Sequence, residues 1–149
     1  MPFDTSLFTA SQVAASISPP GVRDTTLGLT TTIIQTTDAW AIDISWALSG
    51  SLLFPTVSLV GGWNVVAFLE PLDDGANVPM LLSIPGVTTS APVPIPMAGG
   101  TSNVTISVPA GAVRAGLFNL TIAITWTVGA TPLPMAAFSQ GPILSFFVP

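Results

Sequence analysis

Apolar and polar residues alternate with a period of two along most of this chain, from residue 29 onward. One clear run covers residues 39–49, and a second covers residues 118–128. Successive side chains of a strand point to opposite faces, so alternation over eleven residues predicts half-buried β-strands. The apolar face of the first run is formed by Trp40, Ile42, Ile44, Trp46 and Leu48.

Shorter runs with β-branched and aromatic residues predict further strands, separated by turn residues such as Gly61-Gly62, Gly99-Gly100 and Gly141-Pro142. Prolines at 92, 94 and 96 predict an edge strand or a loop. Seven or eight short strands at this spacing are typical of an all-β, antiparallel sandwich. The shorter predicted strands are Leu29–Thr37, Thr56–Leu59, Trp63–Glu70, Met80–Ile84, Asn103–Val108 and Ile143–Val148.

Residues 1–28 lack this alternation and predict an N-terminal arm, which precedes a sandwich domain at residues 29–149. Four apolar residues in the arm have the i, i+3, i+4, i+7 spacing of a short helix, which Pro19-Pro20-Gly21 would end. They are Ala10, Val13, Ala14 and Ile17. The pattern leaves open whether the arm covers its own domain or reaches a neighbouring copy.

The segment Gly116–Ile122, which follows Val108-Pro109-Ala110-Gly111, resembles the approach to strand F of immunoglobulin-like and fibronectin-type sandwiches. Trp63–Phe68 is similar to their strand C, so the resemblance extends over residues 29–148. Phe118 stands where that family places a corner tyrosine, and the chain has no cysteine pair. The resemblance implies an Ig-like β-sandwich, and it implies no activity. Together with the arm at residues 1–28, the expected fold is an Ig-like β-sandwich with an N-terminal extended arm.

Charge is scarce: two arginines and seven acidic residues are the charged residues of the 149, and the chain has no lysine, histidine or cysteine. Without clustered cations, binding to nucleic acid or to anionic lipid is not expected. Without histidine or lysine, no serine or threonine has an ordinary activating base, so we expect no enzyme and no cofactor. The acids Asp38 and Asp43 fit a turn and a solvated strand face better than a catalytic pair.

Residues Met1–Asp4 lack the basic start and apolar run of a signal peptide, which leaves the compartment open between the cytoplasm and export by another route. The uncharged stretch Ser51–Leu69 contains Pro55 and Gly61-Gly62. We therefore expect it to form two strands and a turn, and no insertion into a membrane.

Four oxygen-bearing side chains lie close together around Gly75. Carboxylate and amide oxygens are the ligands that calcium prefers, so this group is a candidate calcium site; a plain hairpin turn is the alternative. The residues are Glu70, Asp73, Asp74 and Asn77.

The four tryptophans could form a platform for sugar rings, although Trp40, Trp46 and Trp126 lie on apolar strand faces and are expected in the core. Trp63 follows two glycines and is the tryptophan expected to be exposed, as a ligand-binding residue. The sequons that begin at Asn103 and Asn119 lie within predicted strands, and chance accounts for them in a threonine-rich chain.

The uncharged faces predict self-association. Edge strands of monomers usually carry lysine, proline or inward charges that block pairing, and charge depletion is also typical of buried interfaces. Seven of the nine charges lie within residues 1–73, so residues 75–149 are expected to supply much of the contact.

The leading hypothesis is a structural subunit that polymerises with copies of itself into a filament, tube or shell. The alternative is a non-catalytic carbohydrate- or calcium-dependent binding module built on Trp63 and the 70–77 loop. The arm residues expected to make the assembly contacts are Phe3, Leu7, Phe8, Val13 and Ile17.

Overall fold

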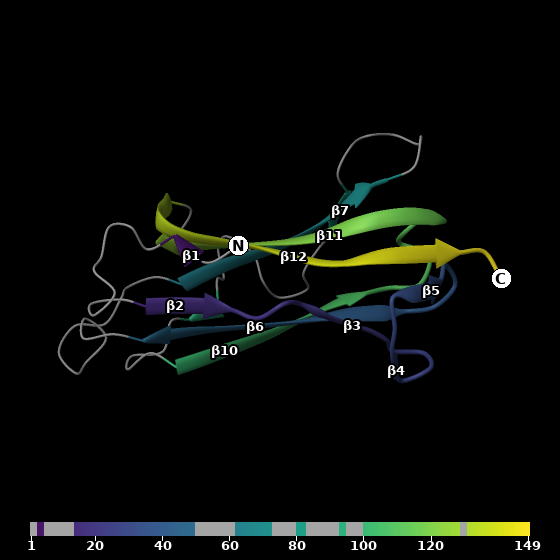
Figure 1. Ribbon diagram of the computed structural model, residues 1–149, viewed down its shortest axis with the longest axis horizontal. Helices are drawn as coiled ribbons and strands as arrows, with labels where there is room; N and C mark the ends of the chain where they lie inside the picture. Colours follow the sequence, from purple (N-terminus) through teal and green to yellow (C-terminus); the bar gives the residue numbers. More distant parts are fainter. Residues whose placement is uncertain are drawn as a thin grey trace.

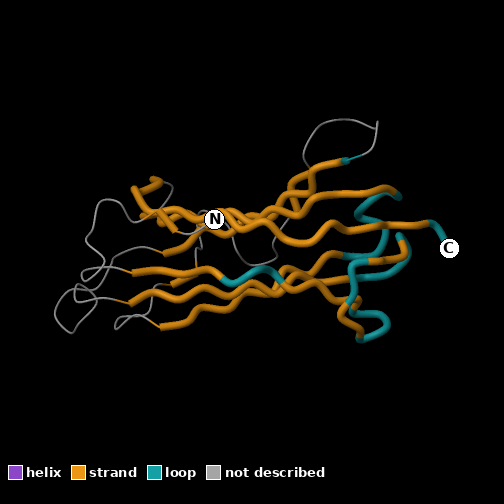
Figure 2. Tube along the Cα trace, in the orientation of Figure 1, coloured by secondary structure: helices purple, strands orange, loops and turns teal. Residues whose placement is uncertain are grey.

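The computed structural model describes residues 3–4, 14–49, 62–72, 80–82, 93–94, 100–128 and 131–149. These residues form strands, turns and loops, and none of them forms a helix. The strands lie in two stacked sheets (Figures 1 and 2), so the predicted all-β sandwich is confirmed. The finer resemblance to the immunoglobulin-like family stays a prediction.

The larger sheet, here sheet A, has seven strands in the order β1-β12-β11-β7-β8, with β5 also paired to β12 and β9 to β7. All pairs are antiparallel except that of β5 with β12. The strands are β1 (Phe3–Asp4), β5 (Ile33–Gln35), β7 (Gly62–Pro71), β8 (Met80–Leu82), β9 (Val93–Pro94), β11 (Gly116–Val128) and β12 (Thr131–Phe147).

The smaller sheet, here sheet B, has five strands in the order β10-β6-β3-β4, with β2 paired to β6. All of its pairs are antiparallel. The strands are β2 (Ala14–Ile17), β3 (Gly21–Asp24), β4 (Leu29–Thr30), β6 (Trp40–Ser49) and β10 (Gly100–Val108).

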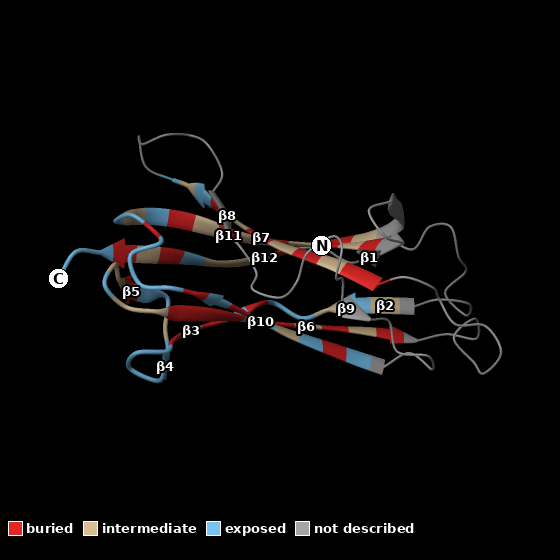
Figure 3. Ribbon diagram, turned by 180° about the vertical axis from the view of Figure 1, so that it is seen from behind, coloured by how far each residue is buried: buried red, intermediate tan, exposed pale blue. Residues whose placement is uncertain are grey.

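Aromatic side chains from both sheets meet in the core. Trp46 of β6 and Trp63 of β7 make an edge-to-face contact, with 6.3 Å between ring centroids. Trp40 contacts Phe146 across the sheets at 5.3 Å. Along β7, β11 and β12, buried positions alternate with half-buried and exposed ones (Figure 3), as the period of two requires.

The long alternating runs are confirmed as β6 and β11, with the predicted apolar faces buried. The shorter predictions within 63–70, 80–84 and 103–108 correspond to β7, β8 and β10. The two residues of the proline-rich segment that the structure describes form β9, which agrees with an edge strand. The predicted strand at residues 56–59 lies outside the described residues.

The predicted single strand Leu29–Thr37 is wrong, because it divides into β4 in sheet B and β5 in sheet A. The chain crosses between the sheets at Thr31, whose hydroxyl oxygen accepts a hydrogen bond from the Ile33 amide at 3.1 Å. A side chain that bonds its own backbone two residues on favours such a turn.

The predicted strand Ile143–Val148 is too short. The observed strand, β12, begins at Thr131 and continues through Gly141-Pro142, where the sequence predicts a turn. The register with β11 shifts there, so these two residues form a bulge within the strand instead of ending it. The sequence did not predict the first half of β12 because it contains Pro132 and Pro134, and proline is disfavoured within strands.

The expected arm is part of the sandwich. β2 and β3 pair with β6, and the backbone of β1 pairs with β12 at Ala136 and Ala137. Residues 14–17 are a strand, so the short helix suggested by the apolar spacing is wrong over its described half. The expected domain boundary after residue 28 falls in the turn between β3 and β4, which are hydrogen-bonded strands of one sheet.

The uncharged stretch Ser51–Leu69 forms strand β7 from Gly62 onward, which confirms the second of its two expected strands; residues 51–61 lie outside the described part. A search of the described residues finds no helix with the length and apolarity needed to cross a membrane.

Replacing Gly141 with alanine should lower the free energy of unfolding by about 1–3 kcal/mol, because the position is overpacked by any side chain. A Cβ there would lie 2.9 Å from Pro20 Cγ and 3.0 Å from Leu120 Cδ2. Urea denaturation measures the change. Gly21→Ala is the matched control, since its added Cβ meets nothing within 4 Å. Equal stabilities of the two variants would contradict this account of the bulge.

Candidate functional site

The outer face of sheet A, which points away from the core, is large and carries little charge. It combines aliphatic and aromatic side chains with amides and hydroxyls, and Glu70 is the single charged residue among the members whose side chains the structure describes. The members lie on β5, β7, β11 and β12. They are Ile33, Asn64, Val66, Phe68, Glu70, Leu117, Asn119, Thr121, Ala123, Phe138, Gln140, Ile143, Ser145 and Phe147.

Four exposed apolar side chains of this face surround Ser145. Ile33 lies opposite Ser145 on one side and Leu117 on the other. Ile143 and Phe147 precede and follow it by two residues on β12, so their side chains share its face. These four residues are here called the apolar patch; their exposed fractions are 62% for Ile33, 47% for Leu117, 55% for Ile143 and 39% for Phe147.

Further along the same face, an aromatic row crosses three strands. Thr121 lies opposite Gln140 on β12 and opposite Phe68 on β7. Phe138 is two residues from Gln140 and is 49% exposed. Two phenyl rings therefore border an amide and a hydroxyl, a combination that offers both a stacking surface and hydrogen bonds.

The outer face of sheet B is covered by hydroxyls and small side chains, with one ion pair. Arg23 Nε donates a hydrogen bond to Asp43 Oδ2 at 2.8 Å, and the Thr105 hydroxyl donates to Asp43 Oδ1 at 2.8 Å. The hydrogen bond from Arg23 lowers the pKa of Asp43 below its usual range. The pair is about half exposed, so it neutralises this face more than it stabilises the fold.

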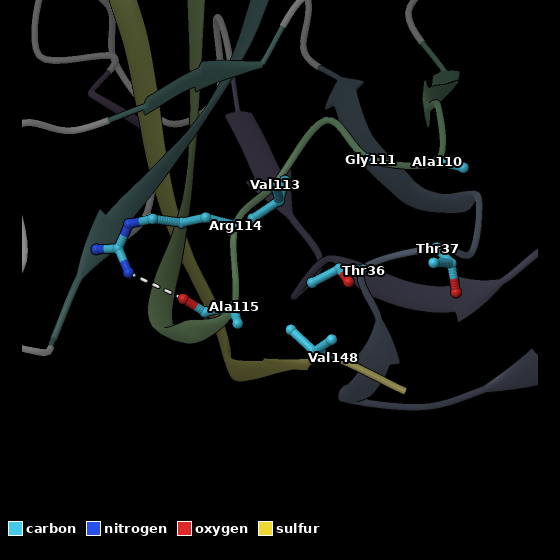
Figure 4. A pocket seen from close by; sticks show the side chains of 8 residues that line it. All are labelled: Thr36, Thr37, Ala110, Gly111, Val113, Arg114, Ala115 and Val148. Carbon is cyan, nitrogen blue, oxygen red and sulfur yellow. Dashed lines mark hydrogen bonds between the residues drawn. The ribbon is translucent and has the colours of Figure 1, made fainter.

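A pocket of about 580 Å³ opens at the end of the sandwich where the chain ends (Figure 4). Thr36 and Thr37 supply its hydroxyls, and Val113 and Val148 supply apolar side chains. The Arg114 side chain extends away from the two threonines, and its Nη1 donates to the carbonyl of Ala115 at 2.9 Å. The pocket is therefore an open recess whose described lining carries one cation, Arg114, and no acidic side chain for acid–base chemistry.

Two carboxyl groups meet at the same end of the molecule. Asp24 is buried, and its Oδ1 accepts a hydrogen bond from the Leu27 amide at 2.9 Å. Burial raises the pKa of the neighbouring Asp38, and a hydrogen bond with Asp24 and the charge of Asp24 raise it further. The Thr25 amide donates a hydrogen bond to the Ala39 carbonyl, and this backbone contact holds the two turns side by side.

Trp63 is not the exposed residue that was expected. It is fully buried, on the same side of β7 as Val65, Ala67 and Leu69. Val66 and Phe68 make the other side of β7 apolar as well, so alternation alone did not distinguish the faces. Asn64 and Glu70 are the signal that marks the outward side. The core positions expected for the other three tryptophans are confirmed.

The structure describes one of the four candidate calcium residues. Glu70 is exposed on the outer face of β7, while Asp73, Asp74 and Asn77 lie outside the described residues. Within the described part of the chain, no three metal-ligating side chains gather into a cluster. The calcium site therefore stays a prediction.

Two of the arm residues expected to reach a neighbour are described, and both contact their own domain. Phe3 pairs through its backbone with Ala137, and Ile17 is half-buried against the core. Leu7, Phe8 and Val13 lie outside the described residues. The outer face of sheet A was missed as a specific site because its residues come from four strands far apart in sequence.

No protein-family model and no curated protein matches the chain. Among solved structures, the chain is similar to the C-terminal domain of wzt, with a TM-score of 0.54 and 11% identical residues. The superposition covers 89% of this chain and 73% of that one. At this identity the similarity shows the fold alone, and it agrees with a β-sandwich.

Replacing Asp38 with asparagine should stabilise the protein near neutral pH. The native pKa of Asp38 is raised from 3.8, so the contribution of this group to wild-type stability is greatest below that value and is lost as the pH rises through the raised pKa. Asparagine keeps the shape without the charge, so the variant lacks this loss. The free energy of unfolding is measured by urea denaturation at pH 3 and pH 7. At pH 3 the variant and the wild type should be similarly stable, and at pH 7 the variant should be the more stable of the two. The same difference at both pH values would contradict the assignment.

Proposed function

We propose that the protein is a non-catalytic structural domain that associates with copies of itself through the outer face of sheet A. The observation that carries the proposal is the apolar patch on a face with one described charge. Exposed apolar patches on otherwise soluble domains mark interaction surfaces. Depletion of charge at the centre of the contact is the compositional signature of protein interfaces.

A second copy is a suitable occupant because the face is neutral and mixed in character. A partner recognised through charge would need complementary charges on this face, and Glu70 is the single charge among its described side chains. In a two-fold contact each patch residue is used twice, so four residues supply eight buried side chains. Burial of an isoleucine, leucine or phenylalanine side chain gives about 1.5–3 kcal/mol when complete, and these side chains start half exposed.

The arm is no longer part of the proposal. Its described strands β2 and β3 pair with β6 of their own chain. This pairing supports an interface made by a sheet face instead of an exchanged segment. The side chain of Ile17 likewise packs against the core of its own domain.

A second candidate function is the binding of a neutral glycan along the aromatic row. Phe138 and Phe68 offer ring faces to the apolar side of a sugar, and Gln140 and Thr121 offer hydrogen bonds to its hydroxyls. This version moves the proposed ligand site from Trp63, which is buried, to Phe138, which is half exposed. Calcium dependence of this site remains a proposal that rests on the 70–77 loop.

Replacing Ile143 with lysine should weaken self-association at least tenfold, because it places a charge at the centre of the proposed contact. Size-exclusion chromatography with light scattering measures the mass over a range of concentrations. Leu27→Lys is the control, since Leu27 is 62% exposed in a turn outside the face and gains the same charge. The proposal fails if both variants associate like the wild type.

The glycan version predicts that Phe138→Ala abolishes binding on an array of neutral oligosaccharides and that Leu27→Lys leaves it unchanged. The loss follows from removal of one ring of the platform. An array with no wild-type binding, or binding that survives Phe138→Ala, would exclude this use of the aromatic row.

A further inference from the structure

Strand β10 forms one edge of sheet B and is much longer than the other outermost strands. It has nine residues, and its pairing is with β6 on one side only among the described residues. Figure 1 shows it along the margin of the lower layer. The other outermost strands, β1, β2, β4, β5, β8 and β9, have two to four residues.

The β10 edge lacks the usual devices against pairing with another chain. Natural edge strands are short, or they carry lysine, proline, bulges or inward charges. Residues 100–108 contain no charge and no proline, and their register with β6 is continuous from Gly100 to Val108. A straight, neutral edge of this length presents a row of backbone donors and acceptors for a further strand.

The side chains of β10 suit pairing of the strand with itself. In a two-fold antiparallel pair centred on Val104, Asn103 lies opposite Thr105 of the second copy, and Thr101 opposite Ser107. All four are exposed on the outer face, and cross-strand pairs of hydroxyl and amide side chains are favourable. Both ends of the strand coincide in this register, because Val104 is its middle residue.

Charge does not oppose this pairing although the whole chain carries a net charge of −5. The nearest described charges are Asp43, which lies opposite Thr105 on β6, and Arg23, and these two neutralise each other. The approach of a second copy along this edge therefore brings no like charges together.

We propose that β10 pairs edge to edge with β10 of a second copy and joins the two B sheets into one continuous sheet. The inference rests on the proposed association through sheet A and adds a second, separate contact to it. With two different two-fold contacts, each copy touches two neighbours, and the copies form an extended chain of subunits instead of a closed pair.

Sedimentation velocity distinguishes the two contacts when the particle mass is compared among four proteins. They are the wild type, Asn103→Lys, Ile143→Lys and the double variant. The wild type should form large particles. Each single variant should stop at a dimer, twice the 15.2 kDa of one chain, and the double variant should be a monomer. Asn103→Thr, which keeps a neutral strand-forming side chain, should behave like the wild type.

A disulfide test reads the register directly and does not depend on the lysine variants. The chain has no cysteine, so a disulfide dimer of Val104→Cys requires the two engineered thiols to meet. Directly opposed Cα atoms of an antiparallel pair lie about 4.5–5.5 Å apart, which is within the range of about 4.4–6.8 Å that a disulfide spans. Cysteines at Ser107 would be roughly 20 Å apart in the same pair and should not cross-link.

Edge pairing is overturned if Asn103→Lys leaves the particle mass unchanged while Val104→Cys does not cross-link above the Ser107→Cys level. Failure of the proposed function gives a different result: Ile143→Lys would retain the wild-type mass, whatever Asn103→Lys does.

Discussion

The contact between Trp46 and Trp63 is the interaction on which the sandwich depends. It joins β6 of one sheet to β7 of the other, and both rings are almost fully buried. A chain without disulfides holds two sheets together only through such side chains, since backbone hydrogen bonds act within each sheet. Trp40 and Phe146 repeat the contact toward the other end. The described apolar side chains on the inward faces of the long strands are buried in this way. The outward faces remain available for contacts with other molecules.

Those outward faces differ between the sheets. Sheet B presents threonine, serine and asparagine around the neutral pair of Arg23 and Asp43. Sheet A presents Ile33, Ile143 and Phe147 beside amides and hydroxyls. The described side chains of the two faces include few of the scattered charges that keep most small domains apart in solution. The two surfaces therefore combine low desolvation cost with exposed apolar area, and both properties favour contact with further copies.

Sequence alternation predicted the two-sheet fold and the inward faces of β6 and β11, because a period of two is a direct consequence of strand geometry. It failed where tertiary packing overrides local signals. Pro132 and Gly141 looked like breaks but lie within β12, and Thr31 divides one predicted strand between two sheets. Trp63 was misplaced because both sides of β7 are apolar. The apolar patch depends on register between strands more than a hundred residues apart, which no local pattern contains.

Sedimentation equilibrium of the wild-type chain over a wide concentration range distinguishes a self-associating protein from a monomer. The mass should rise with concentration through the dimer to larger particles, as expected for copies joined by weak neutral surfaces. A single species of 15.2 kDa at all concentrations up to the millimolar range would contradict self-association.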